Sequence, residues 1–227
     1  MIYLIIFIVL VLLIGPNIWV QLTIKKYAKE IGDLPGNGHE FAQHLIDRFK
    51  ISDVKVEITE ADQDHYDPAD KCVRLSPANF NGKSISAIAI AAHEVGHAIQ
   101  FHHKEAIVRV KEKYTPIAIM IEKIAIGLLS ICPILMVIFK VPQIGLITAF
   151  AAVVSILISV FLQLIILPME WDASFNKALP ILEKGEYLPK KDIPAARKIL
   201  KAAAMTYVAA TLSSILNVWR WIRILKR

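Results

Sequence analysis

An uncharged run from Ile144 to Pro168 is the feature that most constrains the fold of this chain. It is long enough to cross the hydrocarbon core of a membrane as one helix. Met1–Leu22 and Pro116–Phe139 are also predominantly apolar, and hydrophobic residues make up 56% of the 227 residues. With a mean hydropathy of +0.51, the composition is too apolar for an ordinary soluble domain. We therefore predict an α-helical membrane protein with three transmembrane helices.

A further stretch, Ala202–Val218, leaves the number of spans open between three and four, because it is only moderately apolar. The basic, aromatic tail that follows it, Trp219–Arg227, is of a kind that prefers the cytoplasmic surface of a membrane. If the N-terminus lies outside the cell, a cytoplasmic tail must follow an odd number of spans, so we favour three.

Basic residues at both ends of the polar segment predict the orientation of the chain. They are Lys25, Lys26 and Lys29 at one end and Arg109, Lys111 and Lys113 at the other. Cytoplasmic loops carry such an excess of positive charge. We expect a multi-pass protein of the cell membrane, with the lipid bilayer as a partner and the polar segment facing the cytoplasm. The net charge of +6 reflects this bias, and no basic face interleaved with aromatic residues predicts a nucleic-acid partner.

The polar segment is the part of the chain that can build a water-exposed core, and it has a mixed α+β pattern. An amphipathic helix is expected at His39–Phe49, and strands are expected at Val54–Ile58 and Lys71–Leu75. Cys72 falls in the second strand, and no disulfide is implied. The predicted domains are residues 1–24 (anchor), 25–115 (polar segment), 116–168 (transmembrane hairpin) and 169–227 (C-terminal helices).

The sequence His93-Glu94-Val95-Gly96-His97 follows a run of good helix formers that begins with Ser84 and Ser86. On a helix, His93 and His97 lie on one face, one turn apart, and can both bind one metal ion. Glu94 beside them can act as the base that takes a proton from a metal-activated water, which is the chemistry of metallopeptidases. Gly96 inside the helix is costly, which suggests the close approach of another backbone or a ligand. The motif therefore predicts peptide hydrolysis with one Zn²⁺ per chain, and protein or peptide substrates.

A catalytic zinc ion needs a third protein ligand and an open position for water. Glu170, directly after the Ile144–Pro168 run, is the best candidate. His102 and His103 are closer in sequence but point away from the metal-bearing face of the helix. Asp172 or Ser174 could hold an imidazole in the correct tautomer. The strand before the metal helix could offer Val73, Arg74 and Leu75 as an exposed edge on which an extended substrate lies.

Several stretches together resemble the YugP-like neutral zinc metallopeptidases of bacterial membranes. They are Asp64–Pro68, Val73–Ser76, Asn81–Gly82, His93–Gln100, Pro168–Ser174 and Ala203–Ala210. The resemblance implies a membrane-bound zinc peptidase of gluzincin type with a zincin-like catalytic domain, with His93, His97 and Glu170 as ligands and Glu94 as base. The more distant HtpX-like membrane peptidases share this layout. They usually have an aspartate at the position of Ser174, which leaves open whether Ser174 or Asp172 orients an imidazole.

Tyr207 and Arg197 are candidate partners for the developing oxyanion. Two other functions remain as alternatives. One is a site-2-type peptidase whose metal helix lies within the membrane, and the other is a membrane scaffold without catalysis. The first is disfavoured because Lys83 and the sequence His102-His103-Lys104 bracket the helix. The second is disfavoured because a structural zinc needs four protein ligands and no cysteine lies near the motif.

Overall fold

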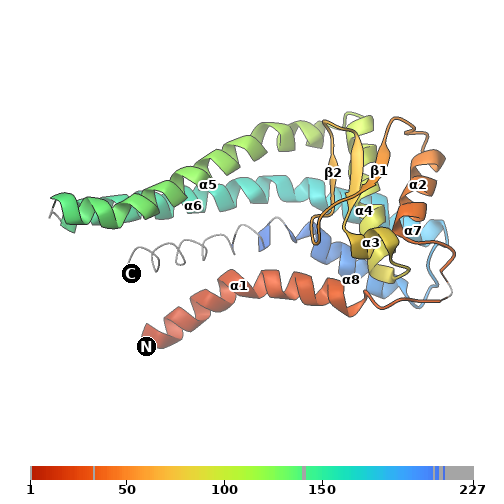
Figure 1. The fold of residues 1–227 in the computed structure, drawn as a ribbon, viewed down its shortest axis with the longest axis horizontal. Helices are drawn as coiled ribbons and strands as arrows, with labels where there is room; N and C mark the ends of the chain where they lie inside the picture. Colours follow the sequence, from red (N-terminus) through yellow and green to blue (C-terminus); the bar gives the residue numbers. More distant parts are fainter. Residues whose placement is uncertain (1, 33, 140–141, 207, 210–211, 213–227) are drawn as a thin grey trace. The chain divides into compact units, whose positions relative to one another are not determined.

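The computed structural model describes residues 2–32, 34–139, 142–206, 208–209 and 212 of the chain (Figure 1). The chain divides into two compact units. One comprises residues 1–18, 109–167 and 206–227, and the other comprises residues 19–108 and 168–205. We call the second one the site unit, because it contains every described residue of the candidate site.

The described part of the chain is mostly helical, with one small sheet. In chain order the elements are α1 (Ile2–Lys26), α2 (Gly38–Arg48), β1 (Lys55–Ile58), β2 (His65–Asp67), β3 (Cys72–Leu75), α3 (Pro77–Asn81), α4 (Ile85–His102), α5 (Ala106–Phe139), α6 (Pro142–Trp171), the π-helix η1 (Asp172–Ala178), α7 (Leu179–Lys184) and α8 (Ile193–Ala204).

The predicted fold class, a membrane protein with three or four transmembrane helices, is wrong. Among the helices of the described residues, none is both long enough and apolar enough to cross a membrane. The prediction relied on runs of apolar residues in the sequence, and such a run does not by itself establish a transmembrane helix. α5, for example, begins with a charged stretch that includes Arg109, Lys111 and Lys113. Of the predicted Ala202–Val218 helix, residues 207, 210–211 and 213–218 lie outside the described residues.

The two helices expected in the polar segment are confirmed, and a side chain caps the start of each, of which only the serine cap of α4 was predicted. Asn37 caps α2 through a capping box. The Asn37 side-chain oxygen accepts from the backbone N–H of Glu40 at 2.9 Å, and the Glu40 carboxylate accepts from the backbone N–H of Asn37 at 2.9 Å. The Ser84 side chain caps α4 by accepting from the amide of Ala87 at 3.1 Å. These bonds satisfy amide groups that a helix start otherwise leaves unpaired.

The sheet corrects the predicted edge strand. Its order is β1-β3-β2, with β1 parallel and β2 antiparallel to β3. The strand that carries Val73, Arg74 and Leu75 is therefore the central one, and its hydrogen-bonding groups are taken by both neighbours. The prediction missed β2, because its three residues are too short to show an alternating pattern. The edges of the sheet are β1 and β2.

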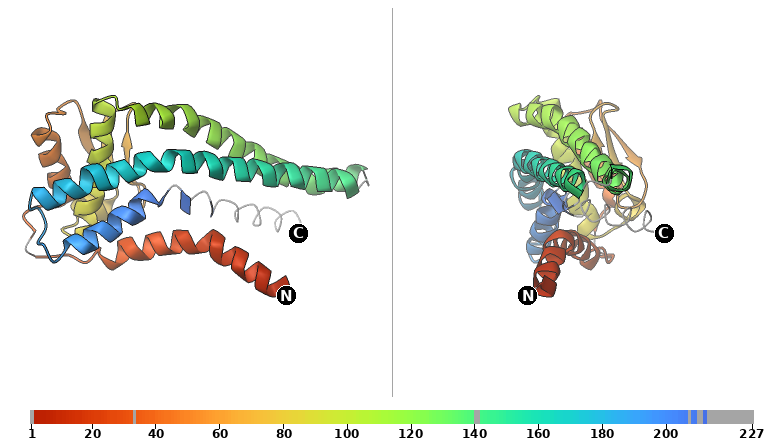
Figure 2. Two further views of the ribbon diagram at one scale, coloured as in Figure 1. Left: turned by 180° about the vertical axis from the view of Figure 1, so that it is seen from behind. Right: turned by 90° about the vertical axis from the view of Figure 1, so that its left-hand side faces the viewer.

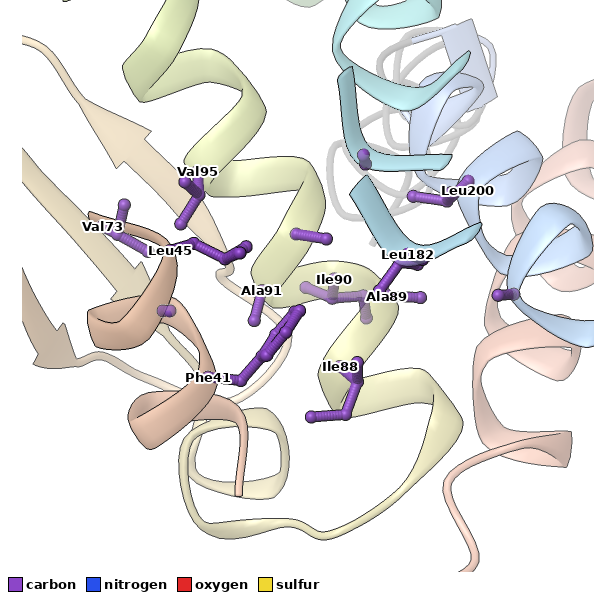
Figure 3. Packing of buried hydrophobic residues seen from close by; sticks show 14 of the residues in the cluster. Phe41, Leu45, Val73, Ile88, Ala89, Ile90, Ala91, Val95, Leu182 and Leu200 are labelled. Atoms are coloured by element: carbon purple, nitrogen blue, oxygen red, sulfur yellow. The ribbon is translucent and has the colours of Figure 1, made fainter. Parts of the chain in front are cut away.

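Helix α4 is the centre of the site unit and contacts α2, α3, β2, β3, α7, α8 and η1. It lies beside the strands in the views of Figure 1 and Figure 2. Figure 3 shows Phe41, Leu45 and Val73 on one side of α4 and Leu182 and Leu200 on the other. Because α4 is surrounded in this way, every residue from Ile85 to Gln100 is buried. A helix buried all round is held rigidly, so side chains that project from it have fixed positions.

Candidate metal centre

Two imidazoles project from one face of α4. His93 is 3% exposed and His97 is 4% exposed, and their ring centroids are 4.7 Å apart. Their spacing of one helical turn, predicted from the sequence, brings both rings to the same place.

Glu170 comes to the imidazoles from the end of α6, far away in the sequence. Its Oε2 atom lies 3.0 Å from His97 Nε2 and 3.4 Å from His93 Nε2. Glu170 is 1% exposed. One ligand atom from each of His93, His97 and Glu170 lies within 4.8 Å of the others, a group that could hold a metal ion. The structure thus brings together the three residues predicted as ligands.

Gln100 determines which nitrogen of His97 faces Glu170. His97 Nδ1 lies 2.9 Å from Gln100 Oε1, and the Gln100 amide nitrogen donates to the Met169 carbonyl at 3.1 Å and to Asp172 Oδ2 at 2.8 Å. Because an amide oxygen only accepts, the network assigns the proton to His97 Nδ1. His97 Nε2 then carries a lone pair and faces Glu170.

Ser174 does the same for His93. Its hydroxyl donates to the carbonyl of Leu200 at 2.9 Å, and its oxygen lies 3.0 Å from His93 Nδ1. A hydroxyl has one proton, so the Ser174 oxygen accepts from His93 Nδ1–H. The lone pair of His93 is therefore at Nε2 as well.

This donor set fits a divalent cation. Two imidazole lone pairs and a carboxylate converge in a buried place, where like partial charges repel strongly. A proton on one imidazole could bridge only that ring to Glu170, whereas a cation can be shared by all three groups. Two imidazole nitrogens and one carboxylate oxygen are a ligand set typical of catalytic zinc, with one position left for water.

Gly96 permits the close approach of the two chain segments that carry the ligands. A Cβ atom at Gly96 would lie 2.9 Å from the carbonyl oxygen of Ala173 in η1. Of the two alternatives predicted for Gly96, another backbone or a ligand, the approach of another backbone is thus confirmed. The neighbours of Ala173 within the same segment, Glu170 and Ser174, both contact imidazoles. α4 and this segment must therefore lie this close for the site to form.

A charged network lies behind the imidazoles. Asp172 accepts from Gln100 and from Asn176, and it pairs with Lys177 at 3.2 Å, which also pairs with Glu105 at 2.9 Å. Burial raises the pKa of the Asp172 carboxyl, but the hydrogen bonds from Gln100, Asn176 and Lys177 outweigh burial, so its pKa lies below the ordinary value. Asp172 is thus ionised and reaches His97 only through Gln100.

Of the two residues predicted to orient an imidazole, Ser174 contacts one directly and Asp172 does so through Gln100. Gln100 was not predicted as a site residue, although its position three residues after His97 puts both on one helix face. It also missed η1, because no simple pattern marks a π-helix. Such turns are frequent at functional sites.

The other predicted residues lie as follows. Glu94 is 6% exposed on α4 and is not part of the group that could hold a metal. Arg197 is paired with Glu183 at 3.2 Å and its side chain is 56% exposed, so the structure does not bring it to the ligands. Tyr207 lies outside the described residues. His102 lies 3.8 Å from Asp53 instead of near Glu170.

Comparison with known proteins identifies the family. A family model described as "Putative neutral zinc metallopeptidase" matches residues 2–226. The chain belongs to this family. It is 34% identical over 216 residues to the protein of Bacillus subtilis (strain 168) named "Putative membrane protease YugP", covering 93% of this chain and 92% of that protein. No solved structure matches the chain. The resemblance inferred from the sequence is therefore confirmed, and the family description indicates zinc-dependent peptidase chemistry.

Proposed function

We propose that this protein is a zinc-dependent endopeptidase in which His93, His97 and Glu170 hold one Zn²⁺ per chain. The observation that carries the proposal is the convergence of three buried electron-pair donors, with both imidazoles held in the tautomer that turns Nε2 towards Glu170 Oε2. Zinc held there would supply Lewis-acid chemistry, by acidifying water and by polarising the carbonyl of the peptide bond.

Glu94 is the general base of the proposed reaction. It neighbours His93 on α4 and is buried, yet it is not part of the ligand group. A carboxylate beside the metal can take the proton of the attacking water and give it to the leaving amine. Its burial keeps its geometry fixed, which is what makes a proton transfer efficient.

The proposed substrates are proteins or peptides that bind as an added strand. Only an edge strand has free hydrogen-bonding groups for such binding. Of the two edges, β2 contacts the metal helix α4, whereas β1 packs against α2 and α3. We therefore assign the substrate to the free edge of β2, His65–Asp67, in place of the central strand that the sequence suggested.

The proposed place of action is the cytoplasmic surface of the cell membrane. The Bacillus relative is named a membrane protease. In the site unit, Lys25, Lys26 and Lys29 are exposed, and such basic residues favour the anionic cytoplasmic leaflet. The test is a single cysteine at exposed Asp62, in a background without Cys72 and Cys132. Labelling of intact cells by an impermeant reagent would contradict this placement.

The function is tested with two substitutions in the site and one outside it. Glu170→Ala should abolish stoichiometric zinc binding, because it removes a ligand. Glu94→Gln should keep zinc and lose about 100-fold or more in the cleavage rate of a quenched-fluorescence peptide library, as expected when a positioned base is removed. Glu60→Gln, the same change at an exposed position, is the control and should keep both properties.

The outcomes separate the candidate functions. Parental cleavage by Glu94→Gln would refute the mechanism. Zinc binding without any cleavage by the parental protein would favour the non-catalytic scaffold. Full zinc occupancy and unchanged affinity in Glu170→Ala would refute the ligand assignment.

A further inference from the structure

Gln100 has an unusual position, because one uncharged side chain touches both segments that carry the proposed ligands. It is 0% exposed. Its oxygen accepts from His97 on α4, and its nitrogen donates to the carbonyl of Met169, the residue directly before Glu170. The Gln100 amide thus joins α4, which carries His97, directly to the end of α6, which carries Glu170.

The orientation of the Gln100 amide is fixed by its partners. Both of its N–H groups are used, one on the Met169 carbonyl and the other on Asp172 Oδ2. A reversed amide would place its oxygen against a carbonyl and a carboxylate, and its N–H groups against His97 Nδ1–H. The Met169 carbonyl and Asp172 Oδ2, which only accept, therefore require the N–H groups of the Gln100 amide on their side, and the amide has a single orientation.

The charged residues behind Gln100 hold it in place. Asp172 Oδ2 accepts from the Gln100 amide, and the Asp172 carboxylate also accepts from Asn176 at 2.7 Å and pairs with Lys177 at 3.2 Å. Lys177 is itself tied to Glu105, just after the end of α4. The charge network thus spans α4 and η1 and presents one carboxylate oxygen to the amide.

We propose that Gln100 is a positioning residue that sets the tautomer of His97 and the spacing between His97 and Glu170. The inference rests on the proposed metal site. It differs from that proposal because it concerns a residue that binds neither metal nor substrate. Without Gln100, the hydrogen-bond partner that the described residues leave to the His97 ring is Glu170 Oε2 at 3.0 Å. The proton of a neutral His97 then moves to Nε2, where that carboxylate accepts it.

The proposal predicts different outcomes for two substitutions of Gln100. Gln100→Met keeps the length and removes every hydrogen bond. Gln100→Glu keeps the acceptor for His97 Nδ1–H but removes the donors to Met169 and Asp172. Gln43→Met is the control, because Gln43 is a half-buried glutamine of α2 whose amide donates to Asp47 of the same helix at 3.0 Å.

The first measurement uses metal-free protein labelled with ¹⁵N-histidine, at a pH of about 8.5, where an ordinary imidazole is neutral. The His97 signals are assigned from a His97→Gln variant. The parental protein and Gln100→Glu should show the proton on Nδ1, and Gln100→Met should show it on Nε2. A residue that only fills space would leave the tautomer unchanged, so this measurement separates positioning from packing.

The second measurement is zinc affinity, by competition with a chelator. We expect Gln100→Met to bind zinc about 10- to 100-fold more weakly, the usual effect of losing a partner behind a ligand. Gln100→Glu should also bind more weakly, because losing the tie to Met169 and placing a carboxylate against Asp172 outweigh the stronger electron donation to His97. Gln43→Met should match the parent.

Three results would overturn the inference: an unchanged tautomer in Gln100→Met, an Nε2 proton in Gln100→Glu, or parental zinc affinity in Gln100→Met. If Gln100→Met does not fold, the tautomer and affinity of Gln100→Glu decide alone. Failure of the parental protein to bind zinc would refute the proposed function instead, while the tautomer of the metal-free protein would still test the role of Gln100.

Discussion

Replacing Gly96 by alanine tests whether the close approach of α4 and η1 sets the geometry of the metal site. The added Cβ would lie 2.9 Å from the Ala173 carbonyl oxygen, about 0.5 Å less than the 3.4 Å at which ordinary van der Waals contact begins. The atom it meets belongs to the backbone, so the two segments must move apart. Gly96 adjoins His97, and Ala173 lies between Glu170 and Ser174, so this displacement acts directly on the ligands.

The expected effect is larger on zinc affinity than on stability. Overpacking costs about 1–3 kcal/mol, and the better helix propensity of alanine returns about 1 kcal/mol. The free energy of unfolding should therefore fall by no more than about 2 kcal/mol. Zinc–ligand distances, however, tolerate only about 0.2 Å. A displacement of about 0.5 Å should weaken zinc binding at least about tenfold, the lower end of the effect of losing a partner behind a ligand.

The assay combines chelator competition with thermal unfolding of the metal-free protein. Gly127→Ala in α5 is the matched control, because nothing lies within 4 Å of the Cβ it adds. It should gain about 0.5–1 kcal/mol and leave zinc affinity unchanged. If Gly96→Ala were stabilised like the control and bound zinc as tightly as the parent, the argument from close approach would be refuted.

Three further predictions follow from the site unit. Ser174→Ala leaves the buried His93 Nδ1–H without its bond of 3.0 Å, whereas the Leu200 carbonyl that accepts from Ser174 at 2.9 Å lies within α8. It should therefore cost about 1–3 kcal/mol in urea unfolding and weaken zinc binding about 10- to 100-fold; unchanged affinity would contradict the role of Ser174. Burial, and to a lesser extent Glu57, raises the pKa of the Cys72 thiol to about 11. In a Cys132→Ser background, iodoacetamide should therefore modify Cys72 at pH 8 only after the protein is unfolded. Rapid modification of Cys72 in the folded protein would contradict its burial. Hydrogen bonding by Arg74 lowers the pKa of the Asp67 carboxyl, so its contribution to stability is present above the ordinary aspartate pKa of about 4 and is lost as the pH falls below it. Urea unfolding from pH 6 to pH 3 should show this loss, and Asp67→Asn should reduce the slope.

The sequence predicted the parts of the site that depend on local spacing. His93 and His97 are one turn apart on a helix whose start is marked by Ser84, and both facts follow from the chain alone. Gly96 indicated a close approach before its partner, Ala173, was known. Local rules sufficed because the signal of each of these residues is its position within one helix.

The parts that failed depend on distant segments. Strand β3 looked like an edge because β2, which covers it, is only three residues long. The apolar runs predicted transmembrane helices, but apolar composition does not by itself determine a span. Gln100 was missed because its role depends on Met169 and Asp172, which approach α4 only in the folded protein.

The two imidazoles share a feature that the sequence pattern of the HtpX-like peptidases would not suggest. Each ring donates its Nδ1 proton to an uncharged oxygen, that of the Ser174 hydroxyl or that of the Gln100 amide. A carboxylate in either place would increase the electron donation of the imidazole to a metal. The carboxylate of Asp172 lies behind Gln100, contacts the Gln100 amide instead of an imidazole, and is paired with Lys177. Among the three proposed ligands the negative charge thus comes from Glu170 alone, so the imidazoles would orient a cation and Glu170 would balance its positive charge. This division explains why the segment from Met169 to Ser174 must be held against α4 by both Gln100 and the close contact at Gly96: the one charged ligand is also the one that comes from a different helix.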